Sequence, residues 1–175
     1  MTAGRAGLVK LAPAVERLRA DDSPFARAAA IFALAKMKKG ADQSPLADIL
    51  LADPSTRARS HAAYILGELG DKSAAPLLRQ AHTRAPAAAS RIEITLMQLQ
   101  IDEALIKLVG EDSSVQAVRA ALYPSQAEDL EASALAVQII GEVRDRRSID
   151  NLIYLAGAKD EAGNSQPGEV RLAVA

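Results

Sequence analysis

An internal repeat constrains this chain more than any other feature of its sequence. The segment Arg27–Met37 aligns with Arg59–Leu69 at an offset of 32 residues, with Arg, Ala, an aromatic residue and Leu in register. A second match joins Gly67–Asp71 to Gly141–Asp145 at an offset of 74 residues, which is two periods of about 37. Periods of this length with purely helical patterning are typical of stacked helix pairs.

Each repeat unit is predicted to contain two helices. The first begins after a turn rich in Asp and Ser, as at Asp21–Pro24 and Asp53–Ser55, because these side chains accept hydrogen bonds from N–H groups of the first helical turn. Apolar residues then recur at helical spacing. The second helices are expected to be shorter, over Pro45–Leu51, Ser73–Thr83, Glu103–Val109 and Ser148–Ala156, and a further helix of this type opens the chain at about Leu8–Arg19.

Two regions fit this scheme loosely. Ala85–Gln100 follows the first-helix pattern only in part, and Ser113–Leu122 starts like a first helix but is followed by Pro124. A long helix is expected next, at about Ala127–Val143. We interpret Ser113–Leu122 as a degenerate or inserted helix, so four or five helix pairs are predicted in a single domain over residues 1–175.

Composition excludes several kinds of site. The chain has no cysteine, so a disulfide, a thiolate metal site and a cysteine nucleophile are all ruled out. Its formal net charge is −1, and the basic excess typical of nucleic-acid-binding domains is missing. No apolar run approaches the length of a membrane-spanning helix, and the first ten residues lack the apolar core of a signal peptide. The compartment is not fixed by these features.

The two ends of the chain do not resemble the polar capping units that close most solenoids. Residues Ala158–Gly168 have the composition of a loop, and Glu169–Ala175 then reads as the start of another first helix. The chain is therefore expected to be a fragment of a longer array, or to associate with another copy through an uncapped end.

One run of residues resembles a known family. It consists of Asp53, Pro54, Arg59, Ala62, Ala63, Leu66, Gly67, Glu68, Leu69, Gly70 and Asp71. This run is similar to the HEAT-like repeats of the type first described in bilin lyases of phycobilisomes. The resemblance implies an all-α fold, a right-handed α-α superhelix. It also implies a ladder of loop Asp and following Arg residues, here Asp22 with Arg27 and Asp53 with Arg59. Repeats of this kind occur in scaffolds, lyase subunits, DNA glycosylases and hydroxylases, so they specify fold and not function.

No constellation of catalytic or metal-ligating residues is evident. The two histidines, His61 and His82, are 21 residues apart, and neither is followed by Glu as in the HEAT-repeat hydroxylases. His61 is expected to be partly buried between helices. Neighbouring carboxylates stand at predicted helix starts, where capping explains them, and the glycines form no phosphate-binding loop. We expect no catalytic residue, no cofactor and no metal.

The sequence therefore favours a non-catalytic scaffold that binds another protein. The row of second helices is predicted to line the binding surface, because solenoids expose such a row. Alternatives are a subunit of a bilin-lyase-type enzyme and a HEAT-like nucleic-acid-binding protein. Candidate partner-binding residues, chosen from the helical spacing, are Glu16, Arg17, Asp48, Arg79, His82, Lys107, Asn151 and Tyr154.

Overall fold

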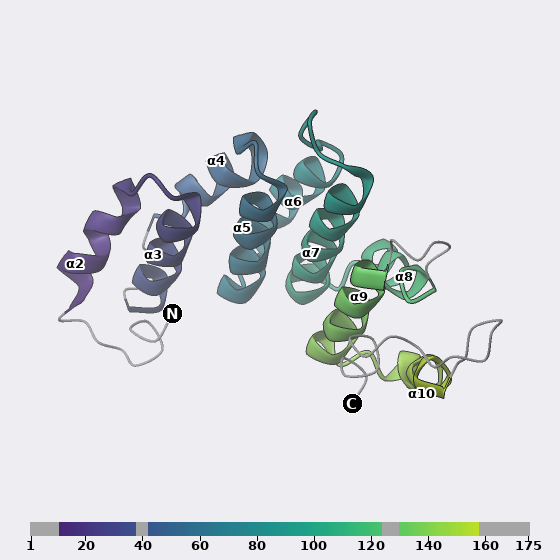
Figure 1. Cartoon of the computed structure of the whole chain (residues 1–175). Helices are drawn as coiled ribbons and strands as arrows, with labels where there is room; N and C mark the ends of the chain where they lie inside the picture. The colour runs from purple at the N-terminus through teal and green to yellow at the C-terminus, as the bar shows by residue number, and fades with distance from the viewer. Residues whose placement is uncertain (1–10, 38–41, 124–129, 158–175) are drawn as a thin grey trace.

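The computed structural model describes residues 11–37, 42–123 and 130–157, and helices are the only regular secondary structure in these ranges (Figure 1). The α-helices are α2 (Ala12–Arg17), α3 (Pro24–Met37), α4 (Ser44–Ala52), α5 (Thr56–Leu69), α6 (Ala75–His82), α7 (Arg91–Val109), α8 (Asp112–Ala120), α9 (Leu130–Val143) and α10 (Ile149–Gly157). Single 3₁₀ turns η2 (Leu18–Ala20), η3 (Lys72–Ala74) and η5 (Arg146–Ser148) follow α2 and precede α6 and α10.

The helices alternate between two positions along the stack. The first helices α3, α5, α7 and α9 stand side by side in one row (Figure 1), and α4, α6 and α8 each pack against the first helix that follows. The fold is an all-α helical-repeat solenoid, as the sequence predicts. None of the helices in the described ranges is both long and apolar enough to cross a membrane.

The loops before the first helices repeat one hydrogen-bonding pattern. The Asp53 carboxylate accepts from the Ser55 N–H at 2.9 Å, and the Ser55 hydroxyl in turn accepts from the Ala58 N–H in the first turn of α5. Asp21 and Ser23 make the same two bonds at the start of α3. Serine is thus the capping residue here, and the aspartate holds the serine in place. Further along the chain, Asp71 and Asp145 cap the turns η3 and η5, as predicted.

The arginines of the expected Asp–Arg ladder bind backbone carbonyl oxygens and not the aspartate carboxylates. Arg59 is buried and donates to the carbonyl oxygens of Asp53 and Arg84, each at 2.6 Å, so it connects the loop before α5 with the loop before α7. Arg27 donates to the carbonyls of Asp21 and Asp22 in its own loop. In both loops the arginine thus binds backbone carbonyls, while the Asp21 and Asp53 carboxylates accept from serine N–H groups.

One predicted boundary is wrong. Residues 91–109 form a single 19-residue helix, α7, in which Glu103–Val109 is the last part and not a separate second helix. A capping box of Ser90 and Glu93 begins α7, and Gly110 ends it in the left-handed conformation at φ 67°. No Gly or Pro interrupts the stretch between them. The helix α8 is consequently the second helix of the α7 unit and not an insertion.

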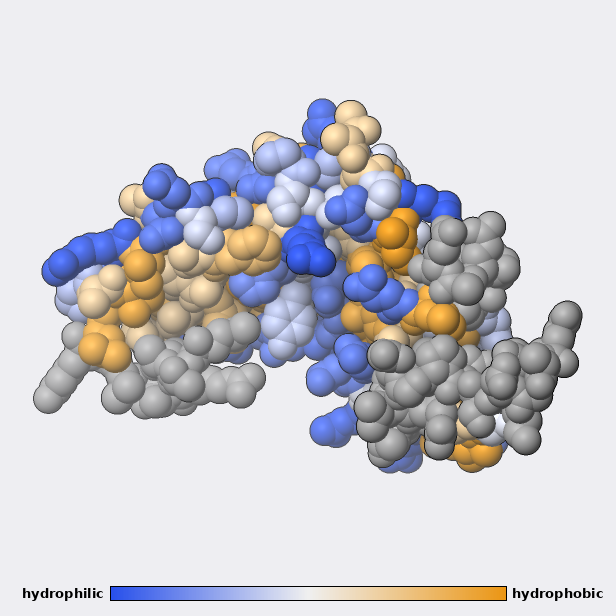
Figure 2. All heavy atoms as spheres, in the orientation of Figure 1, coloured by the Kyte–Doolittle hydropathy of each residue, from blue (hydrophilic) through white to orange (hydrophobic). Residues whose placement is uncertain are grey.

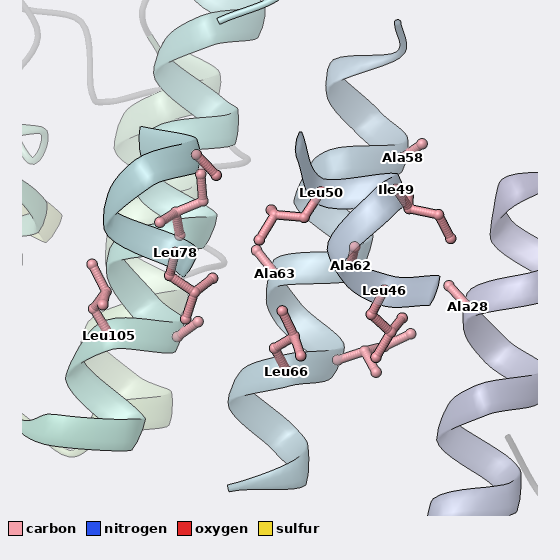
Figure 3. Close-up of a cluster of buried hydrophobic side chains, with 14 of the residues drawn as sticks. Ala28, Leu46, Ile49, Leu50, Ala58, Ala62, Ala63, Leu66, Leu78 and Leu105 are labelled. Carbon is pink, nitrogen blue, oxygen red and sulfur yellow. The ribbon is translucent and has the colours of Figure 1, made fainter. Parts of the chain in front are cut away.

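The core lies between the two positions of the stack. Leu46 and Leu50 of α4 are fully buried beside Ala62 and Ala63 of α5, and Leu78 of α6 is fully buried on the side of Leu105 of α7 (Figure 3). Alanine at these contacts leaves room for the leucines of the neighbouring helices. A second cluster joins α8 to α9 and includes Val118, Leu122, Ala136 and Ile139.

Glycine is required at one position inside a helix. A Cβ atom at Gly67 of α5 would lie 3.0 Å from the Cα atom and 3.1 Å from the Cβ atom of Ala104 in α7. Gly141, which matches Gly67 in the sequence repeat, lies in α9 with nothing within 4 Å of its Cβ position. An added methyl group would therefore clash with Ala104 at Gly67, whereas at Gly141 it would have open space.

This difference predicts opposite effects of the same substitution. Gly67→Ala should lower the free energy of unfolding by about 1–3 kcal/mol, because the added methyl group overpacks a backbone contact. Gly141→Ala should be neutral or stabilising by up to about 1 kcal/mol, because alanine favours a helix over glycine. Urea unfolding followed by circular dichroism measures both, and equal effects would contradict the close approach of α5 and α7.

Candidate interaction groove

Seven of the eight candidate partner-binding residues lie on second helices, as the sequence predicts, and the eighth, Lys107, lies on a first helix. Glu16 and Arg17 lie on α2, Asp48 on α4, and Asn151 and Tyr154 on α10, where Tyr154 is 67% exposed. Glu16 is paired with Arg19 at 2.7 Å. Lys107 lies on α7, in the first-helix row, because α7 is continuous. Among these residues Arg79 and His82 are brought together, at a hollow of about 210 Å³ between α6, α7 and α8.

Arg79 and His82 hold neighbouring helices together. Arg79 donates to both carboxylate oxygens of Glu111, the N-cap residue of α8, at 3.1 and 2.6 Å. His82 Nε2 lies 3.4 Å from the carboxylate of Asp102, which is buried inside α7. The hydrogen bond to Asp102 raises the pKa of His82, against the opposing effect of burial. Both residues therefore have structural partners.

A different surface is formed by the first helices. One stripe of each helix faces it, and successive members of a stripe are three or four residues apart, so they share a helix face. The stripes are Arg57, Ser60, Tyr64 and Glu68 on α5; Leu96, Gln100, Glu103 and Lys107 on α7; and Glu131, Leu135, Gln138 and Glu142 on α9.

These stripes enclose two adjoining hollows. One of about 420 Å³ is lined by residues that include Tyr64, Glu103 and Glu142. The other, of about 380 Å³, is lined by residues that include Arg57 and Leu96. Gln100, Leu135 and Gln138 line both hollows. We call the two hollows together the interaction groove.

The groove combines polar and apolar side chains. Figure 2 shows hydrophilic side chains at the centre of this face, over α5 and α7, with hydrophobic ones on either side. Gln138 and Glu142 on α9 are exposed, and Tyr64 and Gln100 are half-buried. Such a surface offers hydrogen bonds and apolar contact to the same ligand, which is the usual composition of a binding site.

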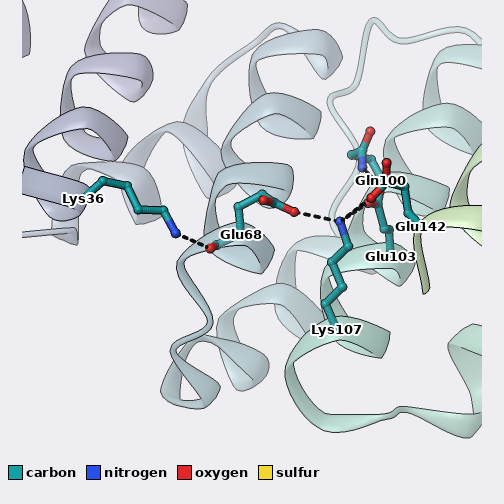
Figure 4. A network of polar contacts seen from close by, with 6 residues as sticks. All are labelled: Lys36, Glu68, Gln100, Glu103, Lys107 and Glu142. Carbon is teal, nitrogen blue, oxygen red and sulfur yellow. Dashed lines mark hydrogen bonds and ion pairs between the residues drawn. The ribbon is translucent and has the colours of Figure 1, made fainter. Parts of the chain in front are cut away.

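Lys107 is the centre of a polar network at one end of the groove (Figure 4). Its Nζ atom lies 2.5 Å from Glu103, 2.8 Å from Glu68 and 4.0 Å from Glu142, and 5.4 Å from the centre of the Tyr64 ring. Burial acts to lower the pKa of Lys107, but hydrogen bonds and charges of Glu103 and Glu68 outweigh it and raise the pKa. The ammonium group is therefore held in its charged form.

Glu103 is the buried carboxylate of this network. Its side chain is only 6% exposed, and it accepts a short hydrogen bond from the Gln100 amide as well as the ion pair with Lys107. On the far side of Glu68, Lys36 of α3 donates to the Glu68 carbonyl oxygen at 3.0 Å. The network thus connects all four first helices.

The helical spacing of these stripes is present in the sequence, but the predicted helix boundaries do not bring the stripes together on one surface. Because the sequence predicts two helices in place of α7, it assigns Gln100 and Lys107 to different helices and does not predict the stripe from Leu96 to Lys107.

His61, the other histidine, is half-buried as predicted, and its ring centre lies 5.6 Å from that of Phe25. Burial lowers the pKa of His61. Within the described ranges, no group of three or more His, Cys, Asp or Glu residues is placed to hold a metal ion.

The fold is that of a helical-repeat protein with an open groove along its first helices. The family model for HEAT repeats matches residues 11–98, just over half of the chain. The chain belongs to the HEAT-repeat family. Comparison with curated proteins and comparison with solved structures gave no match. Beyond the matched residues, α8, α9 and α10 continue the alternation of first and second helices.

The Lys107 network predicts a measurable energetic coupling. Lys107→Met should lower the free energy of unfolding by about 2–3 kcal/mol, because it leaves the buried Glu103 carboxylate without its cation. The double variant Lys107→Met, Glu103→Met should recover most of this loss, since two apolar side chains of similar size replace the pair. Urea unfolding of the wild type, both single variants and the double variant provides a double-mutant cycle for Lys107 and Glu103. Purely additive changes in the free energy of unfolding would contradict an energetic coupling between the two residues.

The pair of His82 and Asp102 predicts a pH-dependent contribution to stability. Folding raises the pKa of His82 above 6.5, the pKa of an unfolded histidine. The stability that the pair contributes is therefore fully present below pH 6.5 and is lost as the pH rises through the pKa of His82 in the folded state. His82→Gln should therefore destabilise more at about pH 6 than at about pH 8.5. Because His61 is present in both proteins, its opposite pH dependence cancels in the difference between their urea unfolding curves. A difference that grows with pH would contradict the prediction.

Proposed function

We propose that this chain is a non-catalytic scaffold that binds a segment of a partner protein in the interaction groove. The observation that carries the proposal is the groove itself: three aligned stripes present the exposed Gln138 amide and the exposed Glu131 and Glu142 carboxylates beside apolar side chains. HEAT repeats generally serve in protein interaction, which supports the same function. The stacked first helices provide a rigid support, so little conformational entropy is lost on binding.

The chemistry of the groove suits a peptide segment. Gln100 and Gln138 line both hollows, and each amide can donate to a backbone carbonyl and accept from a backbone N–H. Leu96, Leu135 and the Tyr64 ring provide apolar contact on either side of the amides. A nucleic acid fits less well, because the carboxylates of Glu103 and Glu142 in the larger hollow repel phosphates.

A peptide selection tests this proposal on a defined probe. The immobilised chain is offered a random dodecapeptide library displayed on phage, and the enriched peptides are synthesised and titrated by fluorescence anisotropy. Gln138→Trp should weaken their binding by about tenfold or more, because the indole fills the groove from an exposed position.

The matched control is Gln80→Trp on α6, next to Arg79 on the second-helix row. It should leave the affinity unchanged. If Gln80→Trp weakens binding and Gln138→Trp does not, the site belongs to the second-helix row and the groove proposal is wrong. A selection that enriches no peptide also overturns it.

A further inference from the structure

We infer that the segment bound in the interaction groove carries an arginine or lysine, which lies at the Glu142 end of the groove, and an apolar residue about three positions away. The inference rests on the proposed function and specifies the chemistry of the partner. It follows from the charges at that end of the groove and from the arrangement of α9.

The charges at the Glu142 end are not balanced. Three carboxylates, those of Glu68, Glu103 and Glu142, surround the single ammonium group of Lys107. Lys36 is a second cation, but it lies on the α3 side of Glu68 and binds the backbone carbonyl there. Between α7 and α9, Glu103 and Glu142 therefore share one cation, and the hollow carries a surplus of negative charge.

Glu142 is the carboxylate that is available to a partner. Its side chain is 67% exposed and reaches Lys107 only at 4.0 Å, whereas Glu103 is buried and contacts Lys107 at 2.5 Å. An incoming guanidinium group can donate two parallel hydrogen bonds to such a carboxylate. The Tyr64 ring lines the same hollow, but Lys107 already lies 5.4 Å from its centre, so the inference rests on Glu142.

The other end of the groove has no such surplus. There Glu131 of α9 lines the smaller hollow together with Arg57 of α5. The residues that line this hollow thus carry one positive and one negative charge. A basic side chain is therefore attracted to the Glu142 end and not to the Glu131 end.

The spacing within the segment follows from α9. Leu135 precedes Glu142 by seven residues, which is about 10 Å along a helix axis. An extended segment covers this distance with about three residues. A basic residue at Glu142 thus places the third residue from it beside Leu135 and Leu96, where an apolar side chain fits.

The peptides selected on the whole chain provide the test. They should be enriched in Arg or Lys, with Leu, Ile, Val or Phe about three positions away. Replacement of an arginine by citrulline, or of a lysine by norleucine, keeps the approximate shape, removes the charge and should weaken binding about tenfold. The affinity should also fall as the salt concentration rises.

Two variants of α9 locate the basic residue. Glu142→Gln should weaken the binding of the same peptides about tenfold, and Glu131→Gln should leave it nearly unchanged. Both side chains are exposed, and thermal unfolding by circular dichroism checks that both variants keep the wild-type stability.

The outcomes separate this inference from the proposed function. One contrary outcome is that the enriched peptides are neutral or acidic and still bind the Gln138→Trp variant more weakly than the wild type. This result would overturn the inference and leave the scaffold proposal standing. Basic peptides that respond to Glu131→Gln and not to Glu142→Gln would also overturn it. A selection without any enriched peptide would remove the proposed function and the inference together.

Discussion

At Gly67 the backbone of α5 lies directly against Ala104 of α7, and the central part of the stack depends on this contact. A side chain at Gly67 would meet both the Cα and the Cβ atom of Ala104, at 3.0 and 3.1 Å. The residues next to this pair in sequence are Glu68 and Glu103, so the close approach brings both carboxylates within reach of Lys107. A packing constraint in the core thus sets the geometry of the polar network at the surface.

The polar network gives the first-helix row its register. Lys107 pairs with one carboxylate on its own helix, one on α5 and one on α9, and Lys36 adds α3. Burying ions in this way adds little net stability, because desolvation opposes the attraction. A shift of α5 or α9 against α7 would, however, separate Glu68 or Glu142 from the Lys107 ammonium group. The network therefore disfavours alternative stackings that the alanine-rich contacts alone would tolerate.

The two sides of the solenoid use their polar residues differently. Between α6, α7 and α8, Arg79 and His82 bind Glu111 and Asp102 and hold the helices together. On the first-helix side, Gln138 and Glu142 remain exposed beside a hollow of about 420 Å³. A side chain that already has a good intramolecular partner gains less from a ligand than one that faces water. This is the physical reason to propose the groove on the first helices, and not the second helices, as the binding surface.

The sequence by itself determined the class of fold and most of the helices. The repeat of Arg27–Met37 at Arg59–Leu69 reports stacked helix pairs, and α3, α4 and α5 lie where the Asp–Ser turns and the helical spacing predicted them, because caps and amphipathic spacing are local. The extent of α7 was also encoded locally, by Ser90, Glu93 and Gly110, but the weak repeat match at Ala85–Gln100 obscured it. Only the tertiary structure decided which stripes of α5, α7 and α9 meet, and so where the interaction groove lies. That choice depends on how closely two backbones approach at Gly67 and Ala104, a contact between residues 37 positions apart that helical periodicity alone does not specify.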